Sequence, residues 1–201
     1  MGTNACYAIT SGTNNTAIGH YAQMLGNASN STFVGSMAGY NSSGNGNTGI
    51  GQGTLNGVGG TNNTCLGQSA STSAGDSNNQ ITLGNSSVTT LRCADTSISS
   101  LSDRRDKTDI VDLPVGLDFI NTIRAVKFKW QTRDKTESKD GTIRAGFIAQ
   151  ELQEAQKDCD YLDLVHDENP EKLEAKQGKL IPVLVKAIQE LSAKVAVLEG
   201  A

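Results

Sequence analysis

Asn15-Thr16-Ala17-Ile18-Gly19 is the stretch that decides the fold of the first half of this chain, because it returns along the sequence at a fixed distance. The segments Ser31-Thr32-Phe33-Val34-Gly35, Asn47-Thr48-Gly49-Ile50-Gly51 and Asn63-Thr64-Cys65-Leu66-Gly67 follow at a period of 16 residues. A fifth, Ile81-Thr82-Leu83-Gly84, comes one residue late. A fixed period indicates units that cannot bury their apolar face alone and that gain a core by stacking. The sequence therefore predicts a solenoid.

Each repeat has an aliphatic residue before its glycine, and stretches rich in Gly, Asn and Ser, such as residues 41–47, lie between the repeats. Gly and Asn adopt positive φ at the lowest cost, so we expect two short strands per coil joined by tight turns. A 16-residue coil has room for only one or two inward aliphatics, which leaves one chain with a thin core and favours oligomerisation. The alternative is a disordered low-complexity segment. Disorder, however, does not need an aliphatic residue at every sixteenth position.

The charged residues divide the chain near residue 100. Residues 1–101 hold only three of the 38 Lys, Arg, Asp and Glu side chains, whereas 17 of the 22 glycines lie there. We expect one domain at 1–101 and a second at 102–201.

Composition also bounds the function. A net charge of -4 gives no clustered basic surface for nucleic acid. No apolar run reaches the length of a membrane span, and the first residues do not resemble a secretion signal, so we expect a soluble protein made in a cytoplasm. The four cysteines show no CxxC pairing and the two histidines lie in different halves, so we expect mostly buried reduced thiols, no metal and no cofactor.

The NTAIG-type repeats over residues 12–84 resemble the trimeric β-roll heads of bacterial autotransporter adhesins and similar segments of phage tail fibres. The resemblance implies a trimeric all-β roll. Two functions fit such a roll: binding of a host receptor or glycan through rows of Asn, Thr and Ser, or service as a rigid spacer. The same rows suggest an ice-binding solenoid, but nothing else in the chain supports that function.

At the start of the second half, Ser102 and Lys107 are a candidate nucleophile and general base. A serine hydroxyl becomes nucleophilic when a neighbouring group removes its proton, and an uncharged lysine can do so. A gap of five residues does not itself bring the two side chains together, so a turn or another subunit must complete the geometry. The simpler interpretation is a surface linker in which Ser102-Asp103 caps a charged turn.

Four motifs give residues 102–201 a resemblance to the intramolecular chaperone domain of endosialidase-type tailspikes, other phage fibres and the myelin regulatory factor. The motifs are Ser102-Asp103-x-Arg105-x-Lys107-x-x-Ile110, residues 123–130 (IRAVKFKW), residues 146–152 (GFIAQEL) and residues 180–191 (LIPVLVKAIQEL). The resemblance implies a homotrimeric folding aid that cleaves itself off between Leu101 and Ser102, with Ser102 as nucleophile and Lys107 as base.

Asp103, Arg105 and Gln150 support the motif assignment, although Gln150 and Glu151 are also explained as a solvated helix start. Asp106 departs from the family pattern, in which we expect an apolar residue. A carboxylate beside Lys107 favours the charged lysine, so we expect cleavage that is slow or dependent on trimer formation.

The rest of the second half predicts an α+β domain with a small antiparallel sheet. Val126, Phe128 and Trp130 alternate with lysines as in a half-buried strand, Gly141 marks a turn, and a second strand is expected around 143–148. A helix is expected over 149–157.

A long helix is expected from Pro182 onward, because five apolar residues recur at spacings of four, three, four and three. They are Leu184, Ile188, Leu191, Val195 and Leu198. The pattern predicts a trimeric coiled coil, and it equally fits an amphipathic helix packed on its own domain.

Together these features predict the distal end of a viral tail fibre or tailspike, located in the virion and used in host attachment. The C-terminal domain would trimerise, fold the fibre and then release itself in one turnover. The alternative is a trimeric structural or adhesive protein that binds a host-surface glycan without cutting. A membrane-tethered transcription factor would need a DNA-binding domain and a membrane span, which this sequence does not contain.

Overall fold

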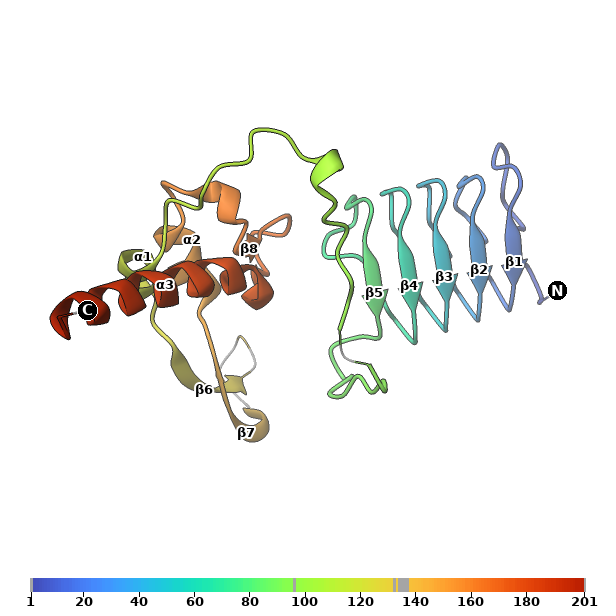
Figure 1. The fold of residues 1–201 in the computed structure, drawn as a ribbon. Helices are drawn as coiled ribbons and strands as arrows, with labels where there is room; N and C mark the ends of the chain where they lie inside the picture. Colours follow the sequence, from blue (N-terminus) through green and yellow to red (C-terminus); the bar gives the residue numbers. More distant parts are fainter. Residues whose placement is uncertain (1, 96, 132, 134–137, 201) are drawn as a thin grey trace. The chain divides into compact units, whose positions relative to one another are not determined.

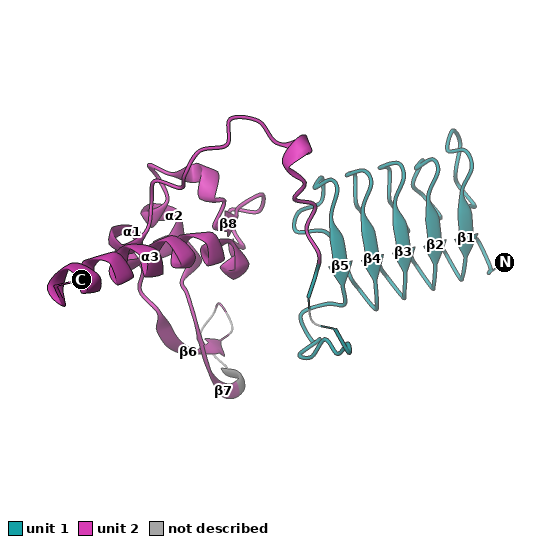
Figure 2. Ribbon diagram, in the orientation of Figure 1, with its two compact units in different colours: residues 1–98 teal, residues 99–201 magenta. Residues whose placement is uncertain are grey.

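The structure is a computed structural model that describes residues 2–95, 97–131, 133 and 138–200, with the side chains of 138–140 left out of the description. The chain forms two compact units, residues 1–98 and residues 99–201 (Figure 2). Each unit is described by itself below.

The first unit is a parallel β-solenoid whose strands follow one another in chain order (Figure 1). The five strands are β1 (Thr16–Ile18), β2 (Thr32–Val34), β3 (Thr48–Ile50), β4 (Thr64–Leu66) and β5 (Ile81–Leu83). Each repeat pairs with its own counterpart, as in Thr16↔Thr32 and Ile18↔Val34. The late fifth repeat is paired in the same way, Thr64↔Ile81. The predicted solenoid is therefore confirmed.

Each described coil contains one strand of three residues, so the expectation of two strands per coil is wrong. The remainder of the coil bends at left-handed corners. One corner holds Asn14, Asn30, Gly46, Asn62 and Asn79, all with φ between 55° and 67°. Gly and Asn adopt this conformation most readily, and a chain that turns so often has no room for a second strand.

The inward residue of each strand is the middle one. Ala17 is half-buried, and Phe33, Gly49 and Cys65 are buried. Phe33 joins Leu55, Val58 and several alanines in one apolar core. The Phe33 ring needs small neighbours, because a Cβ on Gly39 would come within 2.5 Å of it. The aliphatic residue before each glycine points out of the coil and does not contribute to this core.

A buried ladder of polar side chains runs up the solenoid beside the strands. Asn47 Oδ1 accepts a hydrogen bond from the backbone N–H of Asn63 at 2.9 Å, and Asn63 Oδ1 accepts one from Gln80 at 3.0 Å. Asn47 Nδ2 donates to the carbonyls of Gly44 and Gly60. These side-chain amides bond backbone N–H and C=O groups that lie outside the strand pairing. This explains why asparagine recurs at this place in the repeat.

The glycine that ends each repeat is required by stacking. Gly19, Gly35 and Gly51 have φ between 133° and 135°. A Cβ on Gly35 would lie 2.6 Å from the carbonyl carbon and oxygen of Gly51. Only glycine fits both the backbone conformation and the close approach of the next coil.

The second unit contains the elements η1 (Arg104–Asp106), α1 (Leu117–Thr122), β6 (Val126–Gln131), β7 (Ser138–Gly146), α2 (Ala149–Ala155), η2 (Asp160–Leu162), β8 (Val165–His166), β9 (Glu174–Ala175), η3 (Gln177–Leu180) and α3 (Ile181–Leu198). Strands β6 and β7 form one antiparallel pair and β8 and β9 another. The predicted α+β class with small antiparallel sheets and a long C-terminal helix is confirmed.

The core of this unit lies between α1, α2, the short β8 and β9 strands, and the start of α3. Its buried members include Leu152, Leu164 and Val183, with Phe119 and Phe147 packed against them. The β6–β7 hairpin extends from this core (Figure 1). Gly141 is not the hairpin turn that the sequence predicted, because β7 already begins at Ser138 and Gly141 lies inside it with φ 66°. A glycine can hold that conformation within a strand at low cost.

All four cysteines are free thiols, and two are exposed while two are buried. Cys65 and Cys159 are buried, whereas Cys6 and Cys93 are exposed, so the expectation of mostly buried thiols holds for only half of them. Within the described residues, no helix has the length and apolar character needed to cross a membrane.

Candidate functional site

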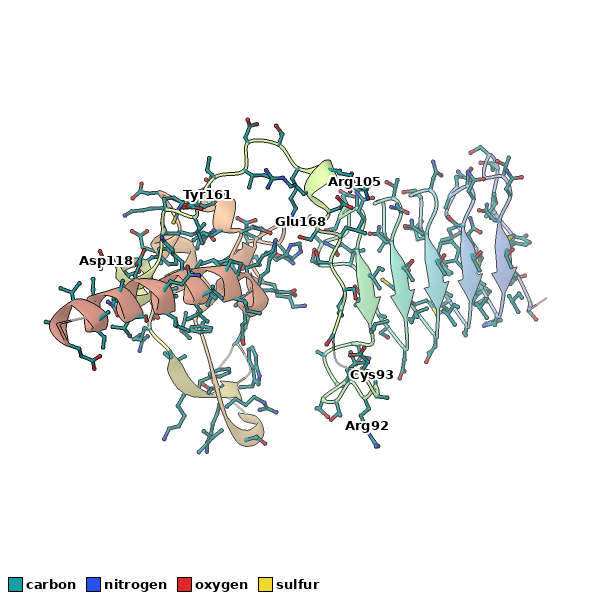
Figure 3. The ribbon with its side chains drawn as sticks, in the orientation of Figure 1. Arg92, Cys93, Arg105, Asp118, Tyr161 and Glu168 are labelled. Carbon is teal, nitrogen blue, oxygen red and sulfur yellow. The ribbon has the colours of Figure 1, made fainter. Side chains whose placement is uncertain are left out.

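The site predicted from sequence lies on a single 3-10 turn at the start of the second unit. The turn is η1, and Figure 3 labels Arg105 on it. Backbone N–H groups of Asp106 and Lys107 donate to the carbonyls of Asp103 and Arg104, both at 3.2 Å. Across this turn, Lys107 Nζ donates a hydrogen bond of 2.6 Å to Ser102 Oγ. The chain itself thus supplies the turn that the spacing required.

Asp103 and Arg105 hold this turn in shape. The Asp103 carboxylate accepts from the backbone N–H of Arg105 at 2.8 Å, which caps the turn, and it also forms an ion pair of 2.7 Å with the guanidinium. The side-chain hydrogen bond from Arg105, followed by the backbone one, holds the pKa of Asp103 below its ordinary value. Asp103 and Arg105 therefore have a structural role beside Ser102, which the Ser-Asp-x-Arg pattern signalled.

The site is open to solvent in the single chain. Residues 101–110 are exposed, and Leu101, the residue before the nucleophile candidate, is completely so. The peptide bond between Leu101 and Ser102 is thus unobstructed by the chain's own side chains.

Asp106 does not pair with the lysine beside it. Among the described residues no ion pair joins Asp106 to Lys107, and the lysine donates to Ser102 instead. The 3-10 turn places consecutive side chains in different directions, which separates the carboxylate from the amine. We expected Asp106 to slow cleavage by holding the charge of Lys107, but no ion pair between the two is found among the described residues.

Gln150 and Glu151 begin α2, and their surroundings differ. Gln150 is exposed, and among the described residues no hydrogen bond joins it to Ser102, whose hydroxyl accepts from Lys107. Glu151 forms a two-pronged ion pair with Arg124, whose Nε lies 3.1 Å from Glu151 Oε2. This hydrogen bond, with desolvation acting against it, lowers the pKa of Glu151. Sequence reasoning missed the pair because the two residues stand 27 positions apart, in two different motifs.

The five apolar residues of the predicted heptad seam lie along α3 and are between 42% and 86% exposed. They are Leu184, Ile188, Leu191, Val195 and Leu198. The helix packs on its own unit through other residues, chiefly Val183 and Ala187. The seam residues therefore keep a large part of their apolar surface exposed in the single chain.

No group of three His, Cys, Asp or Glu side chains in the described residues is arranged to hold a metal ion.

The comparisons with known proteins bear on the second unit. Residues 102–161 match the model of a peptidase family described as chaperone of endosialidase, and the match begins at Ser102. That family is associated with trimeric tail fibres. No curated protein and no solved structure matches the chain. With the 3-10 turn at its first residues, the first part of the second unit, residues 102–161, is thus similar to the chaperone-of-endosialidase family, and it follows a parallel β-solenoid.

Proposed function

We propose that this chain is the distal end of a phage tail fibre whose second unit drives trimerisation and folding and then releases itself by autoproteolysis between Leu101 and Ser102. The virion is then the location of the solenoid, after synthesis in the host cytoplasm. The family match supports the chaperone and peptidase parts of this proposal.

The observation that carries the cleavage proposal is the 2.6 Å hydrogen bond between Lys107 Nζ and Ser102 Oγ. A nucleophile and its base must lie within hydrogen-bonding distance, about 2.6–3.2 Å, and these two atoms do. Ser102 is also the first residue of the family match, and the carbonyl that it would attack belongs to the exposed Leu101.

The chemistry is an acyl shift followed by hydrolysis. Ser102 Oγ forms a bond to the Leu101 carbonyl carbon while uncharged Lys107 takes the hydroxyl proton, and backbone N–H groups stabilise the oxyanion. The bond from that carbon to the Ser102 nitrogen then breaks, and the nitrogen receives the proton as an amine. Water hydrolyses the resulting ester, which leaves a Leu101 carboxylate and a free Ser102. The cycle needs no cofactor and runs once.

The exposure of Lys107 supports dependence on assembly. Ser102 and Lys107 are both exposed in the single chain, and an oxyanion is stabilised best where water is excluded. Trimer formation would cover the site, and the base would be Lys107 of the same chain or of a neighbouring subunit.

The α3 seam supports a trimer, since its apolar residues are spaced as in a coiled coil and remain between 42% and 86% exposed in the single chain. A seam of this kind holds the ends of three chains together, which raises the effective concentration of their solenoids.

Holding the three chain ends together would also prevent the repeats from pairing out of register. Because each coil pairs with a nearly identical one, a chain can pair out of register with a partner, and distant strands form slowly. A domain that assembles first sets the register. Its removal afterwards makes the assembled fibre kinetically hard to undo.

Cleavage is tested by mass. We expect the 21.1 kDa parent to yield two fragments, the second beginning with Ser102, whereas Ser102→Ala remains intact and Lys107→Gln is cut far more slowly. General base catalysis is worth about 10²–10⁴-fold, so Lys107→Gln is expected to slow cleavage by at least about 10²-fold. Ser100→Ala and Arg104→Gln are the matched controls, because both alter exposed neighbours and leave the Ser102–Lys107 pair in place.

Sedimentation of the same samples separates the two halves of the proposal. A parent chain that is trimeric and stays at 21.1 kDa would refute the protease and leave the non-cleaving structural protein. A parent that remains a monomer would refute the folding aid as well.

For the solenoid, the spacer role is favoured over glycan binding. The exposed amides bond one another between coils, as Asn14 Nδ2 does to Asn30 Oδ1 and Asn62 Nδ2 to Asn79 Oδ1. Groups already paired along the solenoid offer less to a ligand.

A further inference from the structure

Two Asn-Gly dipeptides occur in the chain, Asn45-Gly46 and Asn56-Gly57, and both are exposed outside the strands of the solenoid. In such a dipeptide the asparagine side-chain amide lies near the next backbone nitrogen, and glycine has no side chain to shield that nitrogen. The nitrogen can attack the amide carbon, because closing a five-membered ring within one chain needs no encounter between molecules. The two dipeptides share this chemistry, so their surroundings decide which one reacts.

The Asn45-Gly46 dipeptide is held by the neighbouring coil. Asn45 Oδ1 accepts a hydrogen bond of 2.8 Å from the backbone N–H of Ser29. The N–H of Gly46 donates to the Ser29 carbonyl at 2.9 Å. Both reacting groups, the side-chain amide and the next backbone nitrogen, are therefore bound to the same residue. Both hydrogen bonds must break before the ring can close.

The Asn56-Gly57 dipeptide has neither restraint. Among the residues that the structure describes, no hydrogen bond joins the Asn56 side chain or the Gly57 N–H to another group. A Cβ at Gly57 would meet nothing within 4 Å, so the space beside its nitrogen is open. The side-chain amide and the nitrogen of this dipeptide are thus free to approach each other.

We propose that Asn56 is a site of spontaneous deamidation, which converts it to aspartate or isoaspartate with water as the co-reactant, whereas Asn45 is protected by Ser29. The modification is independent of the autoproteolysis proposed above.

The atoms balance in two stages. The Gly57 nitrogen gives its proton to a base in the solvent and bonds to Asn56 Cγ, and Nδ2 takes up a proton and leaves as ammonia. Water then adds to one of the two carbonyl carbons of the ring and breaks the bond from that carbon to the nitrogen. Opening at Cγ leaves aspartate. Opening at the backbone carbon leaves isoaspartate, in which the main chain runs through the former side chain.

The product changes the surface of the solenoid. Residues 1–75 contain no Lys, Arg, Asp or Glu, so the new carboxylate is the single charged side chain in that stretch. We expect the coil itself to remain, because backbone hydrogen bonds hold it on both sides of the turn. Before the turn, the N–H of Leu55 donates to the Ala70 carbonyl at 3.0 Å. After it, the N–H of Gly59 donates to the Gly75 carbonyl at 2.9 Å.

Peptide mapping tests the site in the full chain, which carries Ser102→Ala to prevent cleavage. The folded protein and the same protein in guanidinium chloride are incubated side by side in mildly alkaline buffer. Mass spectrometry then measures aspartate and isoaspartate at positions 45 and 56. In the folded chain we expect conversion at position 56. Conversion at position 45 should be at least about tenfold slower than in denaturant, because two hydrogen bonds must first break.

Asn56→Gln is the matched variant, because its longer side chain would have to close a six-membered ring. Anion exchange of the folded parent should show a species with one more negative charge, which the variant lacks.

The denatured sample separates the effect of structure from that of sequence. Equal conversion at positions 45 and 56 in the folded chain would overturn the proposal, since the neighbouring coil would then protect nothing. A position 56 that reacts in denaturant and stays unmodified in the folded chain would overturn it too. So would the absence of reaction at both positions in denaturant, because the dipeptides would then lack the reactivity assigned to them.

Discussion

Glu190 of α3 accepts a hydrogen bond of 2.8 Å from the backbone N–H of Leu117, the first residue of α1. The contact joins residues 73 positions apart, and Gly116 makes room for it, because a Cβ there would lie 2.5 Å from the Glu190 carboxylate. The carboxylate satisfies one of the unpaired N–H groups that begin α1. Helix α3 is thus fastened to its unit on one side while its seam remains open on the other.

Removing this contact is expected to weaken the second unit. Glu190→Ala leaves the N–H of Leu117 without its partner, which costs about 1–3 kcal/mol of unfolding free energy. Glu190→Gln keeps an acceptor and should retain most of the stability. Urea unfolding followed by the fluorescence of Trp130, the single tryptophan, measures both. Glu199→Ala, at the exposed end of α3, is the control, and an equal loss there would contradict the role of the Leu117 contact.

A charge in the α3 seam is expected to prevent assembly without unfolding the unit. Ile188 is 66% exposed in the single chain, so Ile188→Glu places its charge in water there but buries it in a trimer. Sedimentation should show monomers, and cleavage should fall with the loss of the trimer. Val185→Glu alters an exposed residue outside the seam and should behave as the parent; monomers from both variants would mean that the seam is not the interface.

Glycine at the end of each repeat is expected to be irreplaceable. Gly35→Ala puts a Cβ 2.6 Å from Gly51 in a backbone region that side chains avoid, and such strain alone costs about 1–3 kcal/mol. Thermal unfolding of the solenoid, followed by circular dichroism in the Ser102→Ala chain, should shift to lower temperature. Gly75→Ala is the matched control, because a Cβ at that glycine meets nothing within 4 Å. An unchanged midpoint for Gly35→Ala would contradict the stacking geometry.

Asp163 is expected to make the second unit sensitive to acid. Lys176 Nζ lies 2.6 Å from Asp163 Oδ1 and Lys179 Nζ lies 3.3 Å from Oδ2. The hydrogen bond from Lys176, aided by Lys179, lowers the pKa of Asp163 below its ordinary value of 3.8. A lowered folded-state pKa gives stability that is fully present above 3.8 and is lost as the pH falls through the folded value.

Urea unfolding at neutral pH and below pH 3.8 measures this loss. Asp163→Asn removes the charge while suiting the left-handed backbone at this residue, φ 53°, so it isolates the electrostatic contribution. The variant should lose less stability in acid than the parent. Asp160→Asn, a nearby exposed carboxylate, should follow the parent, and equal acid loss in the parent and Asp163→Asn would exclude the contribution.

The repeat made the strand register of the solenoid predictable, because Thr16, Thr32, Thr48 and Thr64 occupy the same place in the first four strands. It did not reveal which way the strands face. With apolar residues at both Phe33 and Val34, alternation alone does not decide which one points inward. The ring of Phe33 fits against Gly39 and Gly49, and that complementarity of volumes, visible only in three dimensions, determines the answer.

In the second unit, the spacing of residues along the sequence was not enough to predict which side chains meet in space. The residues Ser102 and Lys107 were predictable as a pair only through the family resemblance, since a gap of five residues brings side chains together in neither a helix nor a strand. Their contact depends on the 3-10 turn capped by Asp103. The turn predicted at Gly141 was wrong because glycine occurs both in turns and at irregular places within strands, and the sequence does not distinguish the two.

The fifth coil is one residue longer than the others, yet its strand pairs in register, Thr64↔Ile81. The extra residue is absorbed in the loop before β5, where the Gln80 side chain bonds Ser73 twice, at 2.7 and 2.9 Å. Gly75, within that loop, has open space around its Cα. We therefore expect this loop to accept an inserted peptide on the surface of the solenoid, since the natural extra residue there leaves the pairing of β5 unchanged.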